Sequence, residues 1–173
     1  MEIITLGGGC NWCIEAAFQL VKGVTGTVVG YAGGSVPHPS YEAVYSGKTG
    51  HAEVAQVTFD PTVISLEDIL DVFWIIHDPT TLNRQGPDVG TAYRSIILYN
   101  SDEQKAIAER SKEVVAKLWP DPIVTEIVPF TVFYNAGAEH QNYYRNNQEA
   151  RYCQIIINPK LDRLRQKFAE KLA

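Results

Sequence analysis

The chain has 173 residues, of which 45% are hydrophobic, and it carries 15 Lys and Arg against 20 Asp and Glu, for a net charge of −5 at pH 7. This length fits one domain with a real core, which we expect to span residues 1–173. The negative charge and the lack of a basic cluster argue against a nucleic-acid partner, and no apolar run is long enough to span a membrane.

The first predicted elements place two cysteines at a strand-to-helix turn. Residues 3–6 predict the end of a buried strand, residues 7–9 are glycines, and apolar residues then recur at helical spacing. Because helix N-termini favour an anion, we expect Cys10 to have a pKa below that of a free cysteine, about 8.5. Cys10 is thus a candidate nucleophile and Cys13, one turn on, a candidate partner; the alternative is two buried, inert cysteines.

Residues 27–31 predict a second strand that enters a loop rich in Gly and Pro, residues 32–39, and residues 41–45 predict a short helical turn. Loops of this kind often carry function. A glycine turn at Gly50 then leads into a further strand. We therefore expect Tyr31, at the end of the second strand, to lie beside a functional loop.

Residues 51–59 predict a strand in which side chains alternate between two faces. Glu53 shares its face with Ala55, Val57 and Phe59. If this carboxyl group is partly desolvated, its pKa is raised, and a carboxylic acid that stays protonated near neutral pH can donate a proton to a substrate. The alternative is a solvated glutamate at the wet end of the strand.

The middle of the chain predicts two helices and a central strand. Ser65 can cap a helix with an apolar stripe over residues 66–76, and residues 101–104 fit the capping box of a helix that runs to about Leu118. Between them, residues 80–91 are polar and long for a plain connection, so we expect them to line a site. They lead into residues 93–99, an apolar central strand.

The C-terminal third predicts β segments at residues 123–128 and 130–134, and a polar helix over residues 139–145. Cys153 then opens a predicted strand at residues 155–157. Asn158 and Pro159 can start a final helix with an apolar stripe.

Strands and helices alternate loosely, with hairpin-like pairs among them. This pattern predicts an α+β domain with one mixed or antiparallel sheet, helices packed on it, and a split β-α-β-β-α-β (ferredoxin-like) core. Three cysteines are too few for a disulfide scaffold, which fits a reducing compartment. Because the N-terminus lacks the pattern of a signal peptide, we expect a cytoplasmic protein, and we expect it to be a monomer.

Several motifs of the chain, in order, resemble those of the type A peptide methionine sulfoxide reductases. The clear matches are Gly-Cys-Asn-Trp at residues 9–12, Gly-Tyr-Ala-Gly-Gly at 30–34, Tyr-x-x-Val-x-x-Gly-x-Thr-Gly-His-Ala-Glu at 41–53 and Gln-Gly-x-Asp-x-Gly-x-x-Tyr-Arg-Ser at 85–95. A fifth family motif is matched only in part, at residues 139–143. Because the matches cover most of the chain, the resemblance is highly specific.

The resemblance implies a catalytic domain that reduces methionine S-sulfoxide, free or in proteins, without a metal or cofactor. Cys10 would attack the sulfoxide sulfur, Glu53 would protonate the oxygen, and Tyr31 and Tyr93 would donate hydrogen bonds to it. Asp88 would help through the polar network. Cys10 would become a sulfenic acid, which a second cysteine converts to a disulfide, and thioredoxin or another dithiol would reduce that disulfide.

The resemblance also implies that the two residues that follow Cys10, Asn11 and Trp12, bind the substrate. Trp12 would wall an apolar slot for the methyl group of the substrate. The family usually has Phe next to the nucleophile, where this chain has Asn11. The slot is therefore loosened or rebuilt, and we expect Asn11→Phe to tighten binding of small methyl sulfoxides.

The sequence offers two resolving cysteines. Cys13 can close a disulfide with Cys10 within one helical turn, as in other Cys-x-x-Cys sites. Cys153 follows a tyrosine and resembles the Tyr-Cys pair at which many family members carry their recycling cysteine. Proximity favours Cys13, while Cys153 depends on a contact of the folded chain.

Two other classes of function stay open on the residues alone. A general thiol–disulfide oxidoreductase could use Cys10 and Cys13 without Glu53 or the tyrosines. A zinc-binding module could use Cys10, Cys13, Cys153 and His140, although the spacing lacks a second Cys-x-x-Cys or a His pair.

Overall fold

The computed structural model describes residues 1–172, which form one mixed sheet of six strands and a separate two-stranded hairpin. The sheet order is β7-β6-β1-β3-β2-β8, and only β6 and β7 pair in parallel. The strands are β1 (Glu2–Gly7), β2 (Val24–Ala32), β3 (Ala52–Phe59), β6 (Ile96–Tyr99), β7 (Glu126–Pro129) and β8 (Phe133–Asn135). This sheet confirms the predicted mixed α+β class.

Four neighbouring strands are compatible with the predicted split core. They are β6, β1, β3 and β2, and each is antiparallel to its neighbour. Helix α1 (Asn11–Phe18) connects β1 to β2, and helix α3 (Leu66–Ile75) lies between β3 and β6. Each helix therefore links two strands that have a third strand between them, which is the arrangement of a split β-α-β unit.

The helices and the sheet enclose the main core on one face. Side chains of α1, α3, α4 (Asp102–Ala116) and α6 (Asn158–Phe168) pack there against the sheet residues Ile4, Leu6, Val29, Ala55, Val57, Phe59 and Ile97. The opposite face holds a smaller cluster around Ala52, Val54, Ile96 and Leu98. Since Glu53 has the same parity as Ala55 and Val57 in β3, its side chain emerges on the helix-covered face.

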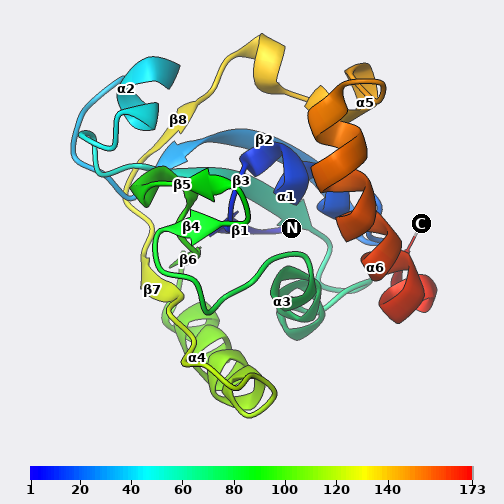
Figure 1. The fold of residues 1–173 in the computed structure, drawn as a ribbon. Coiled ribbons are helices and arrows are strands. Elements are labelled where there is room, and N and C mark those ends of the chain that lie inside the picture. Colours follow the sequence, from blue (N-terminus) through cyan, green and yellow to red (C-terminus); the bar gives the residue numbers. More distant parts are fainter. Residues whose placement is uncertain (173) are drawn as a thin grey trace.

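Segments far apart in the sequence meet at α1. The C-terminal segment, orange to red in Figure 1, lies beside this helix, and both α5 (Tyr143–Asn146) and α6 contact it. Helix α2 (Tyr41–Tyr45) lies beyond the sheet end at which β2 finishes, at the upper left of Figure 1.

Local capping signals are confirmed. The Ser65 hydroxyl accepts from the Asp68 main-chain N–H at the start of α3 (3.1 Å), and Ser101 does the same for Gln104 at the start of α4 (3.1 Å). In residues 1–172, no helix is both long and apolar enough to cross a bilayer.

The prediction of a strand at residues 155–157 is wrong. Residues Cys153–Ile157 form a π-helical turn that continues into α6. Cys153 and Ile157 are buried, whereas Ile155 is 54% exposed, so the buried positions are four residues apart rather than two. Three consecutive isoleucines favour a strand locally, but packing of the helical stripe against α1 decides the conformation.

The prediction of one helix over residues 139–145 is also wrong. A 3-10 turn, Ala138–His140, is separated from α5 by Asn142, whose φ is 54°. Between them the Gln141 side chain binds the edge of the sheet: it accepts from the Val29 N–H (2.9 Å) and donates to the Val29 carbonyl (2.8 Å). The polar pattern of this segment therefore serves a pairing role and not a helix face.

Residues 80–91, predicted without regular structure, contain a small hairpin of β4 (Arg84–Gln85) and β5 (Asp88–Val89). The predicted central strand begins three residues late, at Ile96, because Tyr93 belongs to the 3-10 turn Thr91–Tyr93. The hairpin and this turn bring Asp88 and Tyr93 toward the end of β1.

Candidate active site

Cys10 lies where the sequence predicts it, at the N-cap of α1 directly after the glycine turn that ends β1. Gly9 has a φ of 90°, a conformation that favours glycine. A Cβ on Gly7 would lie 2.8 Å from the Glu53 carbonyl oxygen, so glycine is also needed for close approach to β3. The turn thus holds Cys10, which is 8% exposed, against the strand that carries Glu53.

A cavity of about 140 Å³ opens at this turn. It is lined by Cys10, Asn11, Trp12, Tyr31, Tyr41, Tyr45, Glu53, Asp88, Tyr93, His140 and Tyr152. The cavity brings together the residues that the sequence predicts for catalysis and substrate binding. Four larger hollows on the molecule are lined without any cysteine.

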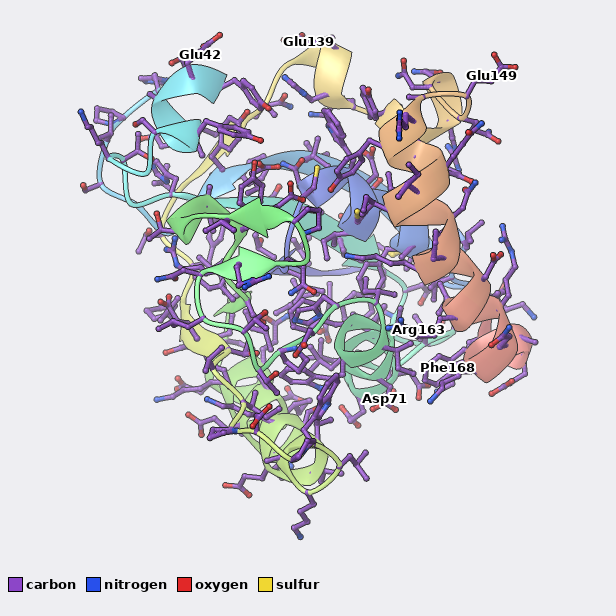
Figure 2. The ribbon with its side chains drawn as sticks, in the orientation of Figure 1. Glu42, Asp71, Glu139, Glu149, Arg163 and Phe168 are labelled. Atoms are coloured by element: carbon purple, nitrogen blue, oxygen red, sulfur yellow. The ribbon has the colours of Figure 1, made fainter. Side chains whose placement is uncertain are left out.

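Figure 2 labels residues of two segments that border the cavity and residues that line one of these hollows. Glu42 and Glu139, at the top of Figure 2, belong to α2 and to the turn Ala138–His140, the two segments that supply Tyr41 and His140 to the cavity. Asp71, Arg163 and Phe168, at the lower right, line the hollow between α3 and α6.

Glu53 is a buried carboxyl group that is 4% exposed. The Asn11 main-chain N–H donates to Glu53 Oε1 (3.2 Å), so the first turn of α1 holds the carboxyl group in place. Burial raises the pKa of Glu53 to about 7, and the negative charge of Asp88 adds to this shift. The carboxyl group can therefore gain or lose a proton near neutral pH.

The expectation of a lowered Cys10 pKa is wrong. Burial raises the pKa of the Cys10 thiol well above its usual range, and the charges of Glu53 and Cys13 raise it further. The hydrogen bond from the Trp12 main chain lowers this pKa, but it is outweighed. In the resting site, Cys10 is therefore a neutral thiol that lines the same cavity as the Glu53 carboxyl group.

Tyr31 and Tyr93 approach Glu53 from two elements. Tyr31 is the register partner of Glu53 in the β2–β3 pair, so the two side chains share a face. Tyr93 belongs to the 3-10 turn, and its carbonyl accepts from the Gly9 N–H (3.1 Å), which ties this turn to the cysteine loop. Burial raises the pKa of both phenols, so both stay protonated and able to donate.

Asp88 reaches the cavity from the small hairpin and is bound by a tyrosine that the sequence analysis did not single out. The Tyr152 hydroxyl donates to Asp88 Oδ2 (2.8 Å), and its oxygen lies 3.9 Å from Cys13 Sγ. In the sequence, Tyr152 is noted only as the neighbour of Cys153.

Aromatic rings form the wall of the cavity around Trp12. The Trp12 ring stacks on Tyr143, with 3.6 Å between ring centroids and an interplanar angle of 8°, and Tyr152 meets it edge-on at 5.9 Å. Tyr41 and His140 stack at 5.2 Å. Tyr41, Tyr45 and His140 also line the cavity and are not predicted as lining residues from the sequence. The one local signal for them is the spacing of Tyr41 and Tyr45, one helical turn apart after a long loop.

Asn11 lines the cavity, and its amide is bound to the sheet. The Asn11 Nδ2 donates to the Gly30 carbonyl (3.2 Å), and the residue is 3% exposed. The polar end is thus bound to β2, and the apolar wall comes from Trp12 and the tyrosines. A phenyl ring at this position would lose that hydrogen bond.

The two remaining cysteines have different surroundings. Cys13 and Cys153 are both buried in the main core, but Cys13 lies in the first turn of α1 and contacts the Tyr152 hydroxyl, whereas Cys153 lies in the π-helical turn before α6. Burial raises the pKa of both, and for Cys13 this shift is opposed by Lys160 and by the hydrogen bond to Tyr152. Neither thiol lines the cavity.

Within residues 1–172, His, Cys, Asp and Glu side chains form no group of three that could hold a metal ion. Cys10, Cys13, Cys153 and His140 therefore do not converge as the zinc-binding alternative requires.

Comparison with known proteins places this site in a family context. The family model described as peptide methionine sulfoxide reductase matches residues 2–172. The chain is 52% identical over 171 residues to a peptide methionine sulfoxide reductase MsrA of Thermus thermophilus (99% of this chain, 97% of that protein). It is 54% identical over 163 residues to the MsrA of Leptospira borgpetersenii (94% and 93%).

Solved structures are similar as well. The reduced form of Mxr1 from Saccharomyces cerevisiae matches with a TM-score of 0.84 at 39% identity, over 88% of each chain. Methionine sulfoxide reductase A of Corynebacterium diphtheriae matches with a TM-score of 0.80 at 36% identity, over 86% of this chain and 76% of that one. Mxr1 in complex with Trx2 matches with a TM-score of 0.60 at 32% identity, over 82% and 84%.

Proposed function

Because the chain belongs to the peptide methionine sulfoxide reductase family, we propose that Cys10 and Glu53 carry out its reaction, the thiol-dependent reduction of methionine sulfoxide, in the aromatic cavity. The observation that carries this assignment is the pairing of a cysteine at a helix N-terminus with a buried carboxyl group whose pKa is about 7. One group supplies the nucleophilic sulfur and the other supplies a proton at neutral pH.

The first step transfers oxygen from one sulfur to another. The Cys10 sulfur attacks the sulfoxide sulfur while Glu53 gives its proton to the oxygen, and the thiol proton of Cys10 restores Glu53. The oxygen ends on Cys10, which is oxidised to a sulfenic acid, and methionine leaves as a reduced thioether. The raised pKa of Cys10 does not block this step, because the proton needs to travel only to the neighbouring carboxyl group.

The hydroxyl groups of Tyr31 and Tyr93 stabilise the oxygen as it gains charge during this step. Both side chains are nearly buried, at 3% and 4% exposed, so their dipoles act with little screening by water. Asp88 completes the polar side of the cavity through its hydrogen bond with Tyr152.

The cavity distinguishes the substituents of a sulfoxide sulfur. Its polar side, with Glu53 and the two tyrosines, fits the oxygen, and the stacked wall around Trp12 fits the methyl group. With attack fixed at Cys10, only one epimer can place both groups and direct the rest of the methionine outward. We assign the S epimer, free or in a protein, as the family resemblance implies.

We assign Cys13 as the resolving cysteine. It lies in the same helical turn as Cys10 and has a polar partner in the Tyr152 hydroxyl, whereas Cys153 lies in the π-helical turn before α6. The disulfide between Cys10 and Cys13 then needs an external dithiol. The complex of yeast Mxr1 with Trx2 supports thioredoxin as that reductant. Such a cycle needs a reducing compartment, which supports a cytoplasmic location.

The test is a thioredoxin-coupled assay that compares the two sulfoxide epimers of methionine. We expect turnover of the S epimer and little of the R epimer. Activity on a disulfide substrate with none on either epimer would instead support the general thiol–disulfide oxidoreductase. Mapping the disulfide formed after one equivalent of substrate checks the resolving cysteine separately, since a Cys10–Cys153 bond would contradict the choice of Cys13.

A further inference from the structure

Tyr152 connects two groups that the reductive step does not link. Its hydroxyl donates to Asp88 Oδ2 at 2.8 Å, and the same oxygen is 3.9 Å from Cys13 Sγ. Because the tyrosine hydrogen points to the carboxylate, the oxygen is free to accept the hydrogen of the Cys13 thiol. The three groups form a chain of hydrogen bonds that runs from Cys13 to the cavity.

We propose that Tyr152 relays the proton of Cys13 to Asp88 while Cys13 closes a disulfide with the oxidised Cys10. This inference rests on the proposed function, in which Cys13 is the resolving cysteine. Tyr152 then acts as a catalytic residue of the resolving step, since its hydroxyl contacts the reacting sulfur.

The step balances without any further reactant. The Cys13 sulfur forms a bond to the sulfur of the Cys10 sulfenic acid, and the S–O bond of that sulfenic acid breaks. The thiol proton of Cys13 passes to the Tyr152 oxygen while the Tyr152 proton passes to Asp88. Asp88 lines the same cavity as Cys10, and it returns the proton to the departing oxygen, which leaves as water.

The surroundings of Cys13 explain why a relay is useful. Burial raises the pKa of its thiol, and the negative charges of Asp88 and Glu53 raise it further. The opposing cation is Lys160, which lies at the start of α6 beside the glycine turn, 3.9 Å from where a Cβ on Gly9 would be. A thiolate is thus costly before the reaction starts, so a route that removes the proton during attack lowers the barrier.

The decisive variant is Tyr152→Phe, which keeps the ring that meets Trp12 edge-on and removes only the hydroxyl group. The protein is mixed with one equivalent of methionine sulfoxide and quenched at increasing times. Methionine release, trapping of the sulfenic acid by dimedone, and the loss of free thiols are measured on the same samples. We expect disulfide formation to slow by roughly 10²-fold relative to methionine release, so that the sulfenic acid accumulates.

The pH profile separates a relay from a structural role. Without the relay, Cys13 must lose its proton to water, so we expect the disulfide rate of Tyr152→Phe to rise about tenfold per pH unit from about pH 6 to about pH 8. The parent rate, with an internal acceptor, is expected to change much less. Asp88→Asn can still accept the tyrosine hydrogen bond but cannot take the proton, and it should give the same ratio of steps as Tyr152→Phe.

Tyr144→Phe is the matched control. Tyr144, like Tyr152, donates its hydroxyl to a side chain, in this case that of Asn158 at the start of α6. Unlike Tyr152, Tyr144 does not line the cavity. We expect this variant to keep the parent ratio of disulfide formation to methionine release.

Three results bear on the inference in distinct ways. Failure of the parent to release methionine would overturn the proposed function itself. A Cys10–Cys153 disulfide in the parent would overturn the choice of Cys13 and the relay with it. A Cys10–Cys13 disulfide that forms in Tyr152→Phe at the parent rate and with the parent pH profile would overturn the relay alone.

Discussion

Two buried titratable groups flank the glycine turn before Cys10, and they behave in opposite ways. On one side His77 is 2% exposed, and a Cβ on Gly8 would lie 2.8 Å from its ring. On the other side Glu53 is 4% exposed, and the same turn packs against its carbonyl oxygen. Burial lowers the pKa of His77 to about 3 but raises that of Glu53 to about 7.

The difference lies in how their polar atoms are bound. His77 Nδ1 donates to the Phe73 carbonyl (2.6 Å), and Nε2 is bound to the Ser95 hydroxyl (2.8 Å), which in turn binds Thr125 (2.7 Å). The neutral ring is thus fully satisfied and keeps one protonation state across the physiological range. Glu53 faces an open cavity and a thiol, so it can change state. The first group supports the turn, and the second is the group to which we assign the proton transfer.

The largest effect is expected from Cys10→Ser on the chemical side of this comparison. A serine hydroxyl stays protonated and is a poor nucleophile toward sulfur, so reduction of methionine sulfoxide should be abolished. Coupled turnover and single-turnover release of methionine measure it, with thermal unfolding as the check that the fold is intact. Turnover near the parent rate would show that the nucleophile is misassigned.

Glu53→Gln should slow methionine release in a single turnover by roughly 10²–10⁴-fold, which is the usual contribution of a positioned general acid. The amide keeps the shape and can accept the Asn11 N–H, but it does not supply the proton readily. The matched control is Gln56→Glu, which exchanges an amide for a carboxyl group, the reverse of Glu53→Gln, on the opposite face of β3. If Glu53→Gln releases methionine at the parent rate at neutral pH, the acid role is wrong.

The two groups also predict opposite effects of pH on stability. The pKa of His77 falls from 6.5 to about 3 on folding, so the unfolded chain binds the proton more readily. Its contribution is fully present above about pH 6.5 and is lost as pH falls toward 3, at about 1.4 kcal/mol per pH unit. His77→Gln should be less stable at neutral pH and should lose stability less steeply in acid. Urea unfolding at several pH values tests this, and an unchanged slope would contradict it.

For Glu53 the sign is reversed. Its pKa rises from 4.5 to about 7 on folding, so the folded chain binds the proton more tightly, and stability is lost as pH rises through this window. The shift corresponds to about 3 kcal/mol above neutral pH. Glu53→Gln should therefore be more stable than the parent at about pH 8, with little difference near pH 4. An equal gain at both pH values would show that the charge is not the cause.

The sequence predicts the chemical side of this comparison better than the supporting side. Cys10 and Glu53 are found from local patterns, because a glycine turn before a helix and the alternation of a strand fix where these side chains point. The sign of the Cys10 pKa is not local, since it depends on burial and on a charge that the fold brings from β3. The helix N-terminus, which can be read from the sequence, is the weaker effect.

The parts that sequence patterns miss come from contacts between distant segments. Tyr41, His140 and Tyr152 line one cavity but come from three parts of the chain. No spacing within one segment indicates that these three side chains meet. His77 directly follows the predicted helix of residues 66–76, but its hydrogen bond to Ser95 depends on tertiary packing. The π-helical turn at Cys153 similarly follows from tertiary packing, which overrides the strand preference of isoleucine.

The smallest effect is expected at Asn11, which has both a chemical and a supporting contact. Its main-chain N–H binds the Glu53 carboxyl group, and its side chain binds the Gly30 carbonyl of β2. The sequence alone suggests that Asn11→Phe tightens substrate binding, but the structure predicts the reverse. The ring would lose the hydrogen bond to the Gly30 carbonyl, worth about 0.5–1.5 kcal/mol, and would have to fit a buried position that now holds a smaller side chain.

We therefore expect Asn11→Phe to lower the stability by about 1–3 kcal/mol and to raise the KM for small methyl sulfoxides a few-fold. Asn11→Leu serves as a partner variant, since it has a similar size, adds no charge and cannot donate to Gly30. If loss of the hydrogen bond is the main cause, the two variants should lose similar stability at neutral pH. A lowered KM in Asn11→Phe would show instead that the cavity can accept the ring, with Trp12 and the tyrosines moving aside.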